Sequence, residues 1–321
     1  MSIPQVNTAP AATAVLGAAT IGSSAILIRL SGESPATVAF FRCAGALAVL
    51  AVLAVLEHRR RGPRSRSSHT WSLLAGVLLG ITLVLQNHAI AALGAGIATV
   101  LSNLQVLFVA LAGWALFAER PTRSYFLALP AALFGVLLVS GALETATPTT
   151  VTASGVLIGV LTSAAYAAFM LATKRGGRGG PPHVVGPLAE INLAAMGIAL
   201  LYGLARGDFD PTPAWPAWGW LLLLALGPQL LGWFLITTSM KRLPIALTAL
   251  ILLLQPLVAV ALSAFLLGER FSPAQLVGCA VLLAAVLFAG AGGRPASWPA
   301  RQGELAGSTA RVARETANSP C

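Results

Sequence analysis

The chain has 321 residues, of which 57% are hydrophobic and only 9% are charged, and its formal net charge is +10. Soluble domains carry about 25% charged residues, so this composition excludes an ordinary soluble protein. The positive charge does not indicate nucleic-acid binding, because the basic residues lie in short gaps between apolar runs rather than in one stripe.

Ten apolar runs of membrane-spanning length follow one another along the chain. A helix needs about 20 residues to cross the hydrocarbon core, and backbone groups in lipid must be hydrogen-bonded within their own segment. We therefore predict an all-α integral membrane protein with ten transmembrane helices. The predicted spans are 11–30, 35–56, 71–91, 97–117, 124–142, 154–173, 184–204, 217–238, 244–267 and 273–291. The polar residues 292–321 are predicted to form a disordered cytoplasmic tail.

Lysine and arginine are distributed unevenly between the two sides of this predicted bundle. If the N-terminus is cytoplasmic, 16 of the 20 lie in inner loops or in the tail, 3 lie in outer loops, and Arg42 lies inside the second span. The positive-inside rule therefore predicts that both termini are cytoplasmic. Residues 1–10 lack the basic side chains that begin a cleavable signal peptide, so we expect no cleavage.

The second half of the chain repeats the first with an offset of 150 residues. Gln105 matches Gln255, and the dipeptide Glu119-Arg120 matches Glu269-Arg270, without any gap. Each Glu-Arg pair is predicted to end a helix at a membrane surface, with a gating ion pair as the alternative. Because five spans is an odd number, the second copy must enter the membrane upside down, as in many secondary transporters. The two predicted inverted five-helix repeats are 11–142 and 154–291.

Three segments carry a recognisable pattern: SPATVAFFRCAGALAVL, LQVLFVALAGWALFAERPT and LLLQPLVAVALSAFLLGERFSPAQLVGCAVLLAAVLF. They include Pro35, Arg42 and Pro256, and with the ten-helix plan they resemble the EamA-type transporters of the drug/metabolite transporter (DMT) superfamily. The fourth span departs from that pattern, with Val106 in place of a proline and Ala118 in place of a glycine. The resemblance implies an inner (plasma) membrane carrier that exports amino acids or other small metabolites.

Three ionisable residues lie inside predicted spans, where a charge is costly and is a functional candidate by default. Arg42 and Glu190 lie on equivalent helices and approach the midplane from opposite sides, so both are predicted to line a central cavity. Arg42 would meet a substrate carboxylate, and Glu190 an ammonium group or a coupling proton. The alternative for both is neutralisation of buried polar groups. For His88, a packed and hydrogen-bonded role is favoured over one in transport.

Neutral polar and aromatic residues form a second tier of candidates. Gln105 and Gln255 share a repeat position near mid-membrane, where they either line a substrate path or hydrogen-bond one helix to another. For the other members helix packing is the favoured role, and these are Tyr166, Gln229 and Trp233.

Prolines inside spans are expected to kink their helices, because each removes a backbone hydrogen bond. These are Pro130, Pro187, Pro228 and Pro256. The sequence contains no Walker loop, HExxH motif or acid–base cluster, and its three cysteines are scattered. It therefore predicts neither an enzyme nor an ATP-driven pump, and no metal or cofactor.

These patterns together predict a secondary transporter that exports a small organic metabolite, such as an amino acid, by alternating access. One intramembrane Arg disfavours a polyanionic substrate, whereas one Arg with one Glu suits a zwitterion. The alternatives are a channel or a non-transporting membrane component and, less favoured, a membrane enzyme that acts on lipid-linked substrates. The expected partners are a small-molecule substrate and the lipid bilayer.

Overall fold

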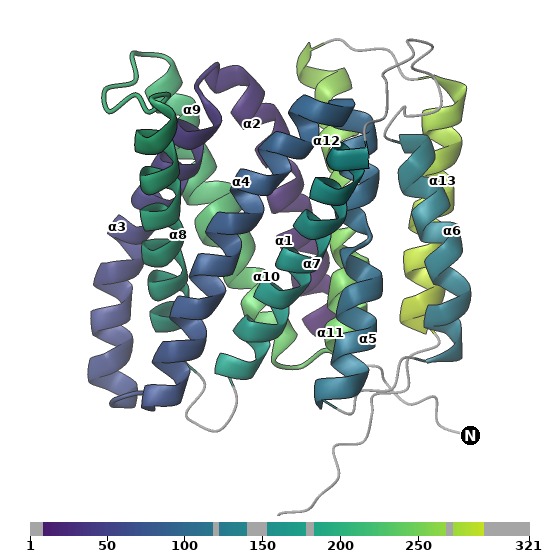
Figure 1. The fold of residues 1–321 in the computed structure, drawn as a ribbon. Helices are drawn as coiled ribbons and strands as arrows, with labels where there is room; N and C mark the ends of the chain where they lie inside the picture. Colours follow the sequence, from purple (N-terminus) through teal and green to yellow (C-terminus); the bar gives the residue numbers. More distant parts are fainter. Residues whose placement is uncertain (1–8, 118–121, 140–152, 178–182, 268–271, 292–321) are drawn as a thin grey trace, which may run out of the picture.

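A computed structural model of the chain describes residues 9–117, 122–139, 153–177, 183–267 and 272–291 (Figure 1). Within these residues, all regular secondary structure is helical. The elements are α1 (Ala9–Gly22), α2 (Ser24–Ser31), α3 (Pro35–Arg61), α4 (Arg66–Asn103), α5 (Gln105–Phe117), α6 (Arg123–Val139), α7 (Ala153–Gly176), α8 (Val185–Arg206), α9 (Ala217–Leu224), η1 (Ala225–Gly232), α10 (Trp233–Met240), α11 (Ile245–Leu252), α12 (Gln255–Leu267) and α13 (Pro273–Ala291). Both Glu-Arg pairs and the predicted tail lie outside the described residues.

In the part of the chain that the structure describes, six helical segments are long and apolar enough to cross a membrane. They are Ala9–Ser31, Pro35–Arg61, Arg66–Gln86, Ser154–Gly176, Val185–Arg206 and Ala217–Met240. Four shorter apolar helices cover Leu101–Leu116, Arg123–Leu138, Ile245–Ala259 and Pro273–Phe288. The prediction of an all-helical, multi-pass membrane protein is therefore confirmed, while ten complete spans and their inversion stay a prediction.

Some predicted spans are interrupted helices. The first span divides at Ser23, and the ninth divides just before Gln255. The boundary between the third and fourth spans differs from the prediction, because α4 continues to Asn103 and α5 begins at Gln105. Glycine weakens a helix without removing a backbone donor, so the glycines between these two spans do not end α4. In both halves a helix thus begins at the repeated glutamine.

The eighth predicted span contains the largest departure from regular helix. Its middle third, η1, is π-helical and contains Pro228, which cannot supply a backbone donor to the hydrogen-bond ladder. Pro130 lies inside α6. The expected kink at Pro187 is not required, since this residue lies in the first turn of α8, where backbone donors have no intrahelical acceptor.

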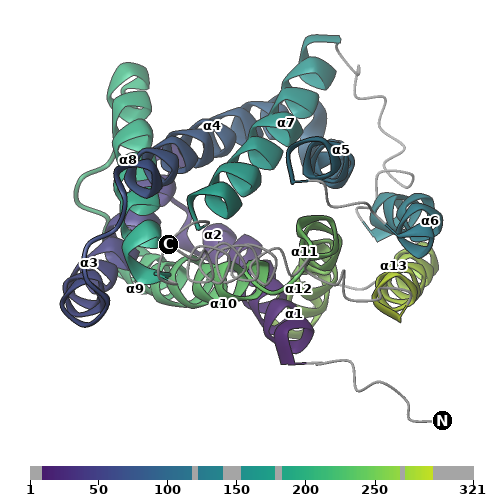
Figure 2. The same cartoon turned by 90° about the horizontal axis from the view of Figure 1, so that it is seen from below.

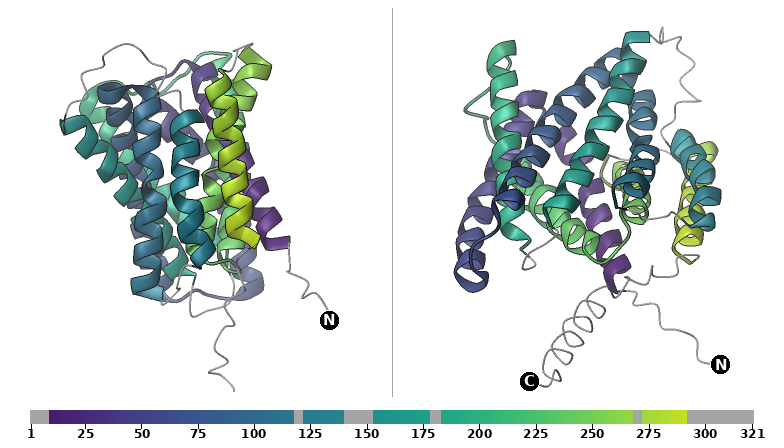
Figure 3. Two further views of the ribbon diagram at one scale, coloured as in Figure 1. Left: turned by 90° about the vertical axis from the view of Figure 1, so that its right-hand side faces the viewer. Right: turned by 60° about the horizontal axis from the view of Figure 1, so that its bottom comes forward.

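Helices of the first half pack against helices of the second half in a reciprocal pattern. The pairs α3–α8 and α6–α13 each join a helix to its equivalent in the other half, and α5 packs on α11, the helix before its own equivalent α12. The packing of α4 on α7 has its counterpart in α10 on α1, and that of α4 on α8 in η1 on α3. Figures 1 and 2 show α6 and α13 side by side at one edge, and Figure 3 shows the same pair from the side.

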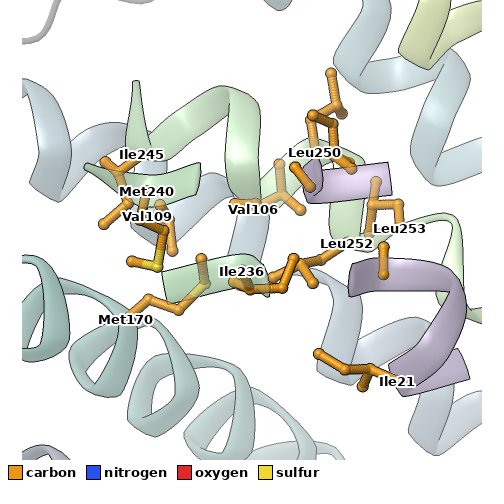
Figure 4. Packing of buried hydrophobic residues seen from close by; sticks show 14 of the residues in the cluster. Ile21, Val106, Val109, Met170, Ile236, Met240, Ile245, Leu250, Leu252 and Leu253 are labelled. Carbon is orange, nitrogen blue, oxygen red and sulfur yellow. The ribbon is translucent and has the colours of Figure 1, made fainter. Parts of the chain in front are cut away.

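The main apolar core is centred on α5, α10 and α11. Figure 4 shows Val106 and Val109 of α5 near Ile245 and Leu250 of α11, with Ile236 of α10 on the other side. All five side chains are buried. The core therefore ties the two halves together, and it extends to Cys43, Ala46 and Leu50 of α3.

The close packing of α4 on α8 depends on Gly76. A Cβ atom there would lie 2.5 Å from the backbone oxygen of Ile191 and 2.7 Å from the Cβ of Ala194. We expect Gly76→Val to reduce the free energy of unfolding by about 1–3 kcal/mol, because a backbone oxygen cannot move aside cheaply. Gly197→Ala is the control, since its added Cβ meets no heavy atom within 4 Å. Thermal unfolding in detergent measures both, and an undiminished Tm for Gly76→Val would contradict this packing.

Candidate functional site

Arg42 is a buried cation in the third turn of α3. Its position is set by the start of the helix, where the Ser34 side chain accepts a hydrogen bond from the Thr37 backbone and Pro35 occupies the first turn. Only 8% of the Arg42 surface is exposed. The Nε atom donates a hydrogen bond to Oε1 of Gln229 over 2.8 Å.

Gln229 belongs to η1 and connects Arg42 to α8. Its Nε2 donates to Oδ1 of Asn192 over 2.8 Å, and Asn192 in turn donates from Nδ2 to the backbone oxygen of Leu188 over 2.8 Å. Gln229 and Asn192 are only 2% and 1% exposed. One chain of hydrogen bonds, Arg42–Gln229–Asn192, therefore runs through the buried contact of α3, η1 and α8. We call it the amide relay.

Asn192 was not among the residues singled out from the sequence. The 150-residue offset that aligns the two halves places Arg42 on Asn192, and α3 and α8 begin at residues with the same offset, Pro35 and Val185. Equivalent positions in the two halves thus bind the two ends of one amide, that of Gln229. The offset applied to Arg42 would have identified Asn192 without a structure.

The amide relay uses only one of the donors of Arg42. Among the described residues, neither Nη group has a hydrogen-bond acceptor, and no carboxylate contacts the guanidinium. A guanidinium held through Nε presents both Nη groups as a fork, whose geometry matches the two oxygens of a carboxylate. Because an uncompensated buried charge is costly, an anionic group at this fork would be stabilised.

Aromatic side chains and Gln255 lie beside this fork. The ring centroids of Phe169 and Trp233 are 4.9 Å apart, and those of Tyr166 and Trp233 are 6.2 Å apart. Tyr166 is close enough to interact electrostatically with both Arg42 and Gln255. The Nε2 group of Gln255 is buried and makes no hydrogen bond of normal geometry within the described residues, although it lies close to the Tyr166 hydroxyl. Five of the predicted residues therefore gather in one region, namely Arg42, Tyr166, Gln229, Trp233 and Gln255.

Two other candidates lie apart from the amide relay. Gln105, 7% exposed at the start of α5, has no described contact with Arg42. His88 shares a hydrogen bond of 3.0 Å with the hydroxyl of Tyr202, and their rings stack edge-on. That is the packed arrangement favoured for this histidine, and a role in transport stays a prediction for both residues.

Glu190 lies in a second cluster, near the start of α4. Its Oε1 atom accepts a hydrogen bond from Nη2 of Arg64 and contacts Nδ1 of His69. The structure therefore does not bring Glu190 into contact with Arg42, although α8 carries both Glu190 and Asn192. The cavity-lining role proposed for Glu190 stays untested. Within the described residues no group of His, Cys, Asp and Glu side chains could hold a metal ion.

The end of the bundle that carries residues 57–69 is rich in charge, and we call it the basic end (the lower end of α3 and α4 in Figure 1). Lys241 follows α10 there, and its amino group donates to the backbone oxygen of His183. Burial lowers the pKa of Lys241 to about 8, an effect that Glu57 opposes and Arg61 reinforces. The amino group is thus partly desolvated even though the residue as a whole is exposed.

The lowered pKa of Lys241 gives the stability a definite dependence on pH. Unfolding takes up a proton between pH 8 and the ordinary pKa of 10.5, so the contribution of Lys241 to stability rises with pH in that window and is least below pH 8. We expect the difference in Tm between the native protein and Lys241→Met to shift in favour of the native protein from pH 7.5 to pH 9.5. A difference that does not change over this range would contradict the lowered pKa.

Comparisons with known proteins identify one family model, two related transporters and a similar fold. The model of the EamA-like transporter family matches residues 9–141 and 153–291. An uncharacterized transporter of Archaeoglobus fulgidus is 27% identical over 279 residues, covering 87% of this chain and 95% of its own length. The uncharacterized transporter YwfM of Bacillus subtilis is 25% identical over 181 residues, 56% of this chain and 59% of its own. A solved crystal structure has the same fold, with a TM-score of 0.70, 18% identity and coverage of 88% of this chain and 97% of that one.

Proposed function

Because the chain belongs to the EamA-like transporter family, we propose that it is a secondary transporter that exports a small organic metabolite by alternating access. An amino acid or another small zwitterion is the first substrate to test. The family and the apolar helices make it a multi-pass membrane protein rather than an enzyme. Its placement in the plasma (inner) membrane, with both termini cytoplasmic, belongs to the proposal and follows from the distribution of Lys and Arg.

This proposal rests on the two Nη groups of Arg42, which have no hydrogen-bond acceptor among the described residues. A permanent structural role would leave the guanidinium paired with a carboxylate, as Arg64 is with Glu190. Arg42 instead keeps its charge in a buried region whose described contacts are an amide, a thiol and a phenol. A monoanionic substrate group bound at the fork would supply the missing countercharge.

The arrangement of the halves supports alternating access. The reciprocal packing of the helices is what two inverted five-helix repeats would produce, with a pseudo-twofold axis passing between α3 and α8. The amide relay crosses this axis, since Arg42 belongs to the first half and Gln229 and Asn192 to the second. The π-helical η1 and the breaks before Gln105 and Gln255 lack a regular hydrogen-bond ladder, so the helices can bend close to the fork.

Counterflow in proteoliposomes tests the proposed function. Purified protein is reconstituted with an unlabelled amino-acid mixture inside, and uptake of each labelled amino acid is then followed. We expect saturable uptake that internal unlabelled substrate accelerates. Flux that neither saturates nor shows counterflow would identify a channel. Failure to exchange any member of panels of amino acids, amines and carboxylates would overturn the carrier.

A proton gradient is the first driving force to examine, because Glu190 is the candidate for a coupling proton. The same vesicles with an imposed pH difference should accumulate substrate against its gradient if transport is proton-coupled. Glu190→Gln should then exchange substrate but no longer respond to the pH difference. Equal accumulation by the two proteins would remove Glu190 from the coupling.

A further inference from the structure

Glu57, at the basic end of α3, caps a helix of the other half. Its Oε1 accepts a hydrogen bond from the backbone N–H of Val184 over 2.9 Å, and its Oε2 accepts one from the N–H of Gly186 over 2.8 Å. Only 8% of the Glu57 side chain is exposed. Both carboxylate oxygens are thus committed to the N-terminus of α8, where a negative charge is favourable.

The N-terminus of α3, which is equivalent to the N-terminus of α8, is capped in a different way. The Ser34 side chain caps its own helix by accepting from Thr37. Val184, at the same position in the second half, has no side-chain acceptor and makes no side-chain cap bond. Pro187, three residues further on, also lacks the N–H that a local cap would use. The start of α8 has therefore lost its own cap and receives one from α3.

Further polar contacts at the basic end also join the two halves. The His183 ring lies 3.2 Å from the backbone oxygen of Gly62, and Arg64 pairs with Glu190. Lys241 donates to the backbone oxygen of His183, which places a cation near Glu57. These contacts link the corner between α3 and α4 to the start of α8 and the end of α10.

The opposite end of the α3–α8 pair is joined by hydroxyl groups. Ser34 donates to the backbone oxygen of Asp208 over 2.6 Å, and the Asp210 N–H donates to Thr37 over 2.9 Å. The described contacts at that end involve no carboxylate cap on a helix of the other half. Across the two halves Glu57 is held by the two backbone donors of α8, and on its own helix it pairs with Arg61 over 3.4 Å. Water can replace the two backbone donors when the helices separate, whereas Arg61 moves with α3.

We propose that Glu57 is a latch that keeps the basic end of the carrier closed, by capping α8 across the two halves, and that opening of this end releases the cap. Its place in a transport cycle rests on the proposed function, but the contact and its opening do not depend on any substrate. Water can solvate both partners once they separate, so release is reversible. A local cap on α8 would persist in every state and could not act in this way.

Cys43 provides an internal reporter of opening. Its side chain is fully buried, next to Arg42 and 3.9 Å from Nε2 of Gln229. In a background with Cys279→Ser and Cys321→Ser, the rate of alkylation by N-ethylmaleimide reports how often solvent reaches this region. We expect Glu57→Gln to raise the rate about fivefold or more. Glu33→Gln is the control, since it removes the same charge beyond the opposite end of α3 and should leave the rate unchanged.

The membrane face from which a reagent reaches Cys43 identifies the end of the bundle that opens. A membrane-impermeant methanethiosulfonate reagent, applied to sealed vesicles of each orientation, should reach Cys43 in Glu57→Gln only from the face that carries the basic end. An alkylation rate equal to that of the parent, in a variant with unchanged Tm, would overturn the latch and leave Glu57 as a static cap. Equal increases in Glu57→Gln and Glu33→Gln, or entry from the opposite face, would overturn it as well.

A second variant keeps the test decisive if Glu57→Gln fails to fold. Val184→Thr is nearly isosteric and gives α8 a local hydroxyl that competes with Glu57 for the N–H of Gly186. The latch predicts faster Cys43 alkylation with a Tm at or above that of the parent, whereas a static cap predicts a slower or unchanged rate. The alkylation test needs no substrate. A failure of counterflow would therefore leave the latch standing, and a failure of the alkylation test would leave the proposed transport standing.

Discussion

Replacing Arg42 by methionine should abolish substrate exchange while the protein stays folded. The substitution removes the Nη fork, and losing a buried charged contact to a carboxylate costs about 2–5 kcal/mol, so we expect the exchange rate at low substrate to fall by about 100-fold or more. The Tm should not fall far, because an apolar side chain of similar length replaces a buried charge that has no ionic partner among the described residues.

Arg42→Lys is the matched comparison for this prediction. A lysine keeps the positive charge but lacks both Nε, which binds Gln229, and the planar fork. We expect an apparent KM raised by about tenfold, with exchange retained. Initial rates of counterflow and thermal unfolding measure both variants. Exchange by Arg42→Met at the native rate would show that the buried cation is structural.

Replacing Gln229 by glutamate should inactivate the carrier and destabilise it less than an apolar replacement does. The new carboxylate would lie 2.8 Å from Nε of Arg42, where the amide oxygen lies now, and would neutralise the guanidinium from within the protein. A substrate anion would then have to compete with a permanent counterion, so we expect exchange to fall by about 10–100-fold. The carboxylate cannot donate to Oδ1 of Asn192 as Nε2 of Gln229 does now, so we expect a Tm below that of the native protein, a loss that the ion pair with Arg42 partly offsets.

Gln229→Leu separates this effect from simple loss of the amide. Leucine leaves Nε of Arg42 and Oδ1 of Asn192 buried without partners, at a cost of about 1–3 kcal/mol for each group. The Tm should therefore fall further in Gln229→Leu than in Gln229→Glu, while both lose exchange. Cys43→Ser should retain substrate exchange, because it changes a side chain beside Gln229 but leaves the amide relay intact. Full activity in Gln229→Glu would contradict an anion site at Arg42.

Several features of the fold were predictable because they depend on composition over long windows. Runs of about 20 apolar residues predict helices in lipid whatever their partners are. The 150-residue offset aligned the two halves before any contact was known. The positions at which helices break were not predictable from composition. The sequence marks Pro228, but the resulting π-helical segment depends on how η1 packs on α1 and α3.

The charged residue of the candidate site was predictable from the sequence, whereas most of its hydrogen-bond partners were not. Arg42 was identified because any cation inside a span is unusual. Asn192 was missed because a neutral amide is common in helix interfaces, although it binds the same glutamine. Glu190 was predicted, like Arg42, to line a central cavity, but it pairs with Arg64, a residue of a turn 126 positions away in the chain. Helical periodicity carries no information about such a contact.

We propose that the Nη fork of Arg42 binds the carboxylate of the transported solute. The most direct measurement is ligand-induced stabilisation of the purified protein by an amino acid that exchanges in counterflow, compared with the carboxamide of the same amino acid. We expect the native protein to prefer the carboxylate by about tenfold or more in apparent Kd, and Arg42→Lys to show a much smaller preference. If the variant keeps the full preference of the native protein, the carboxylate binds elsewhere and the proposed site is wrong.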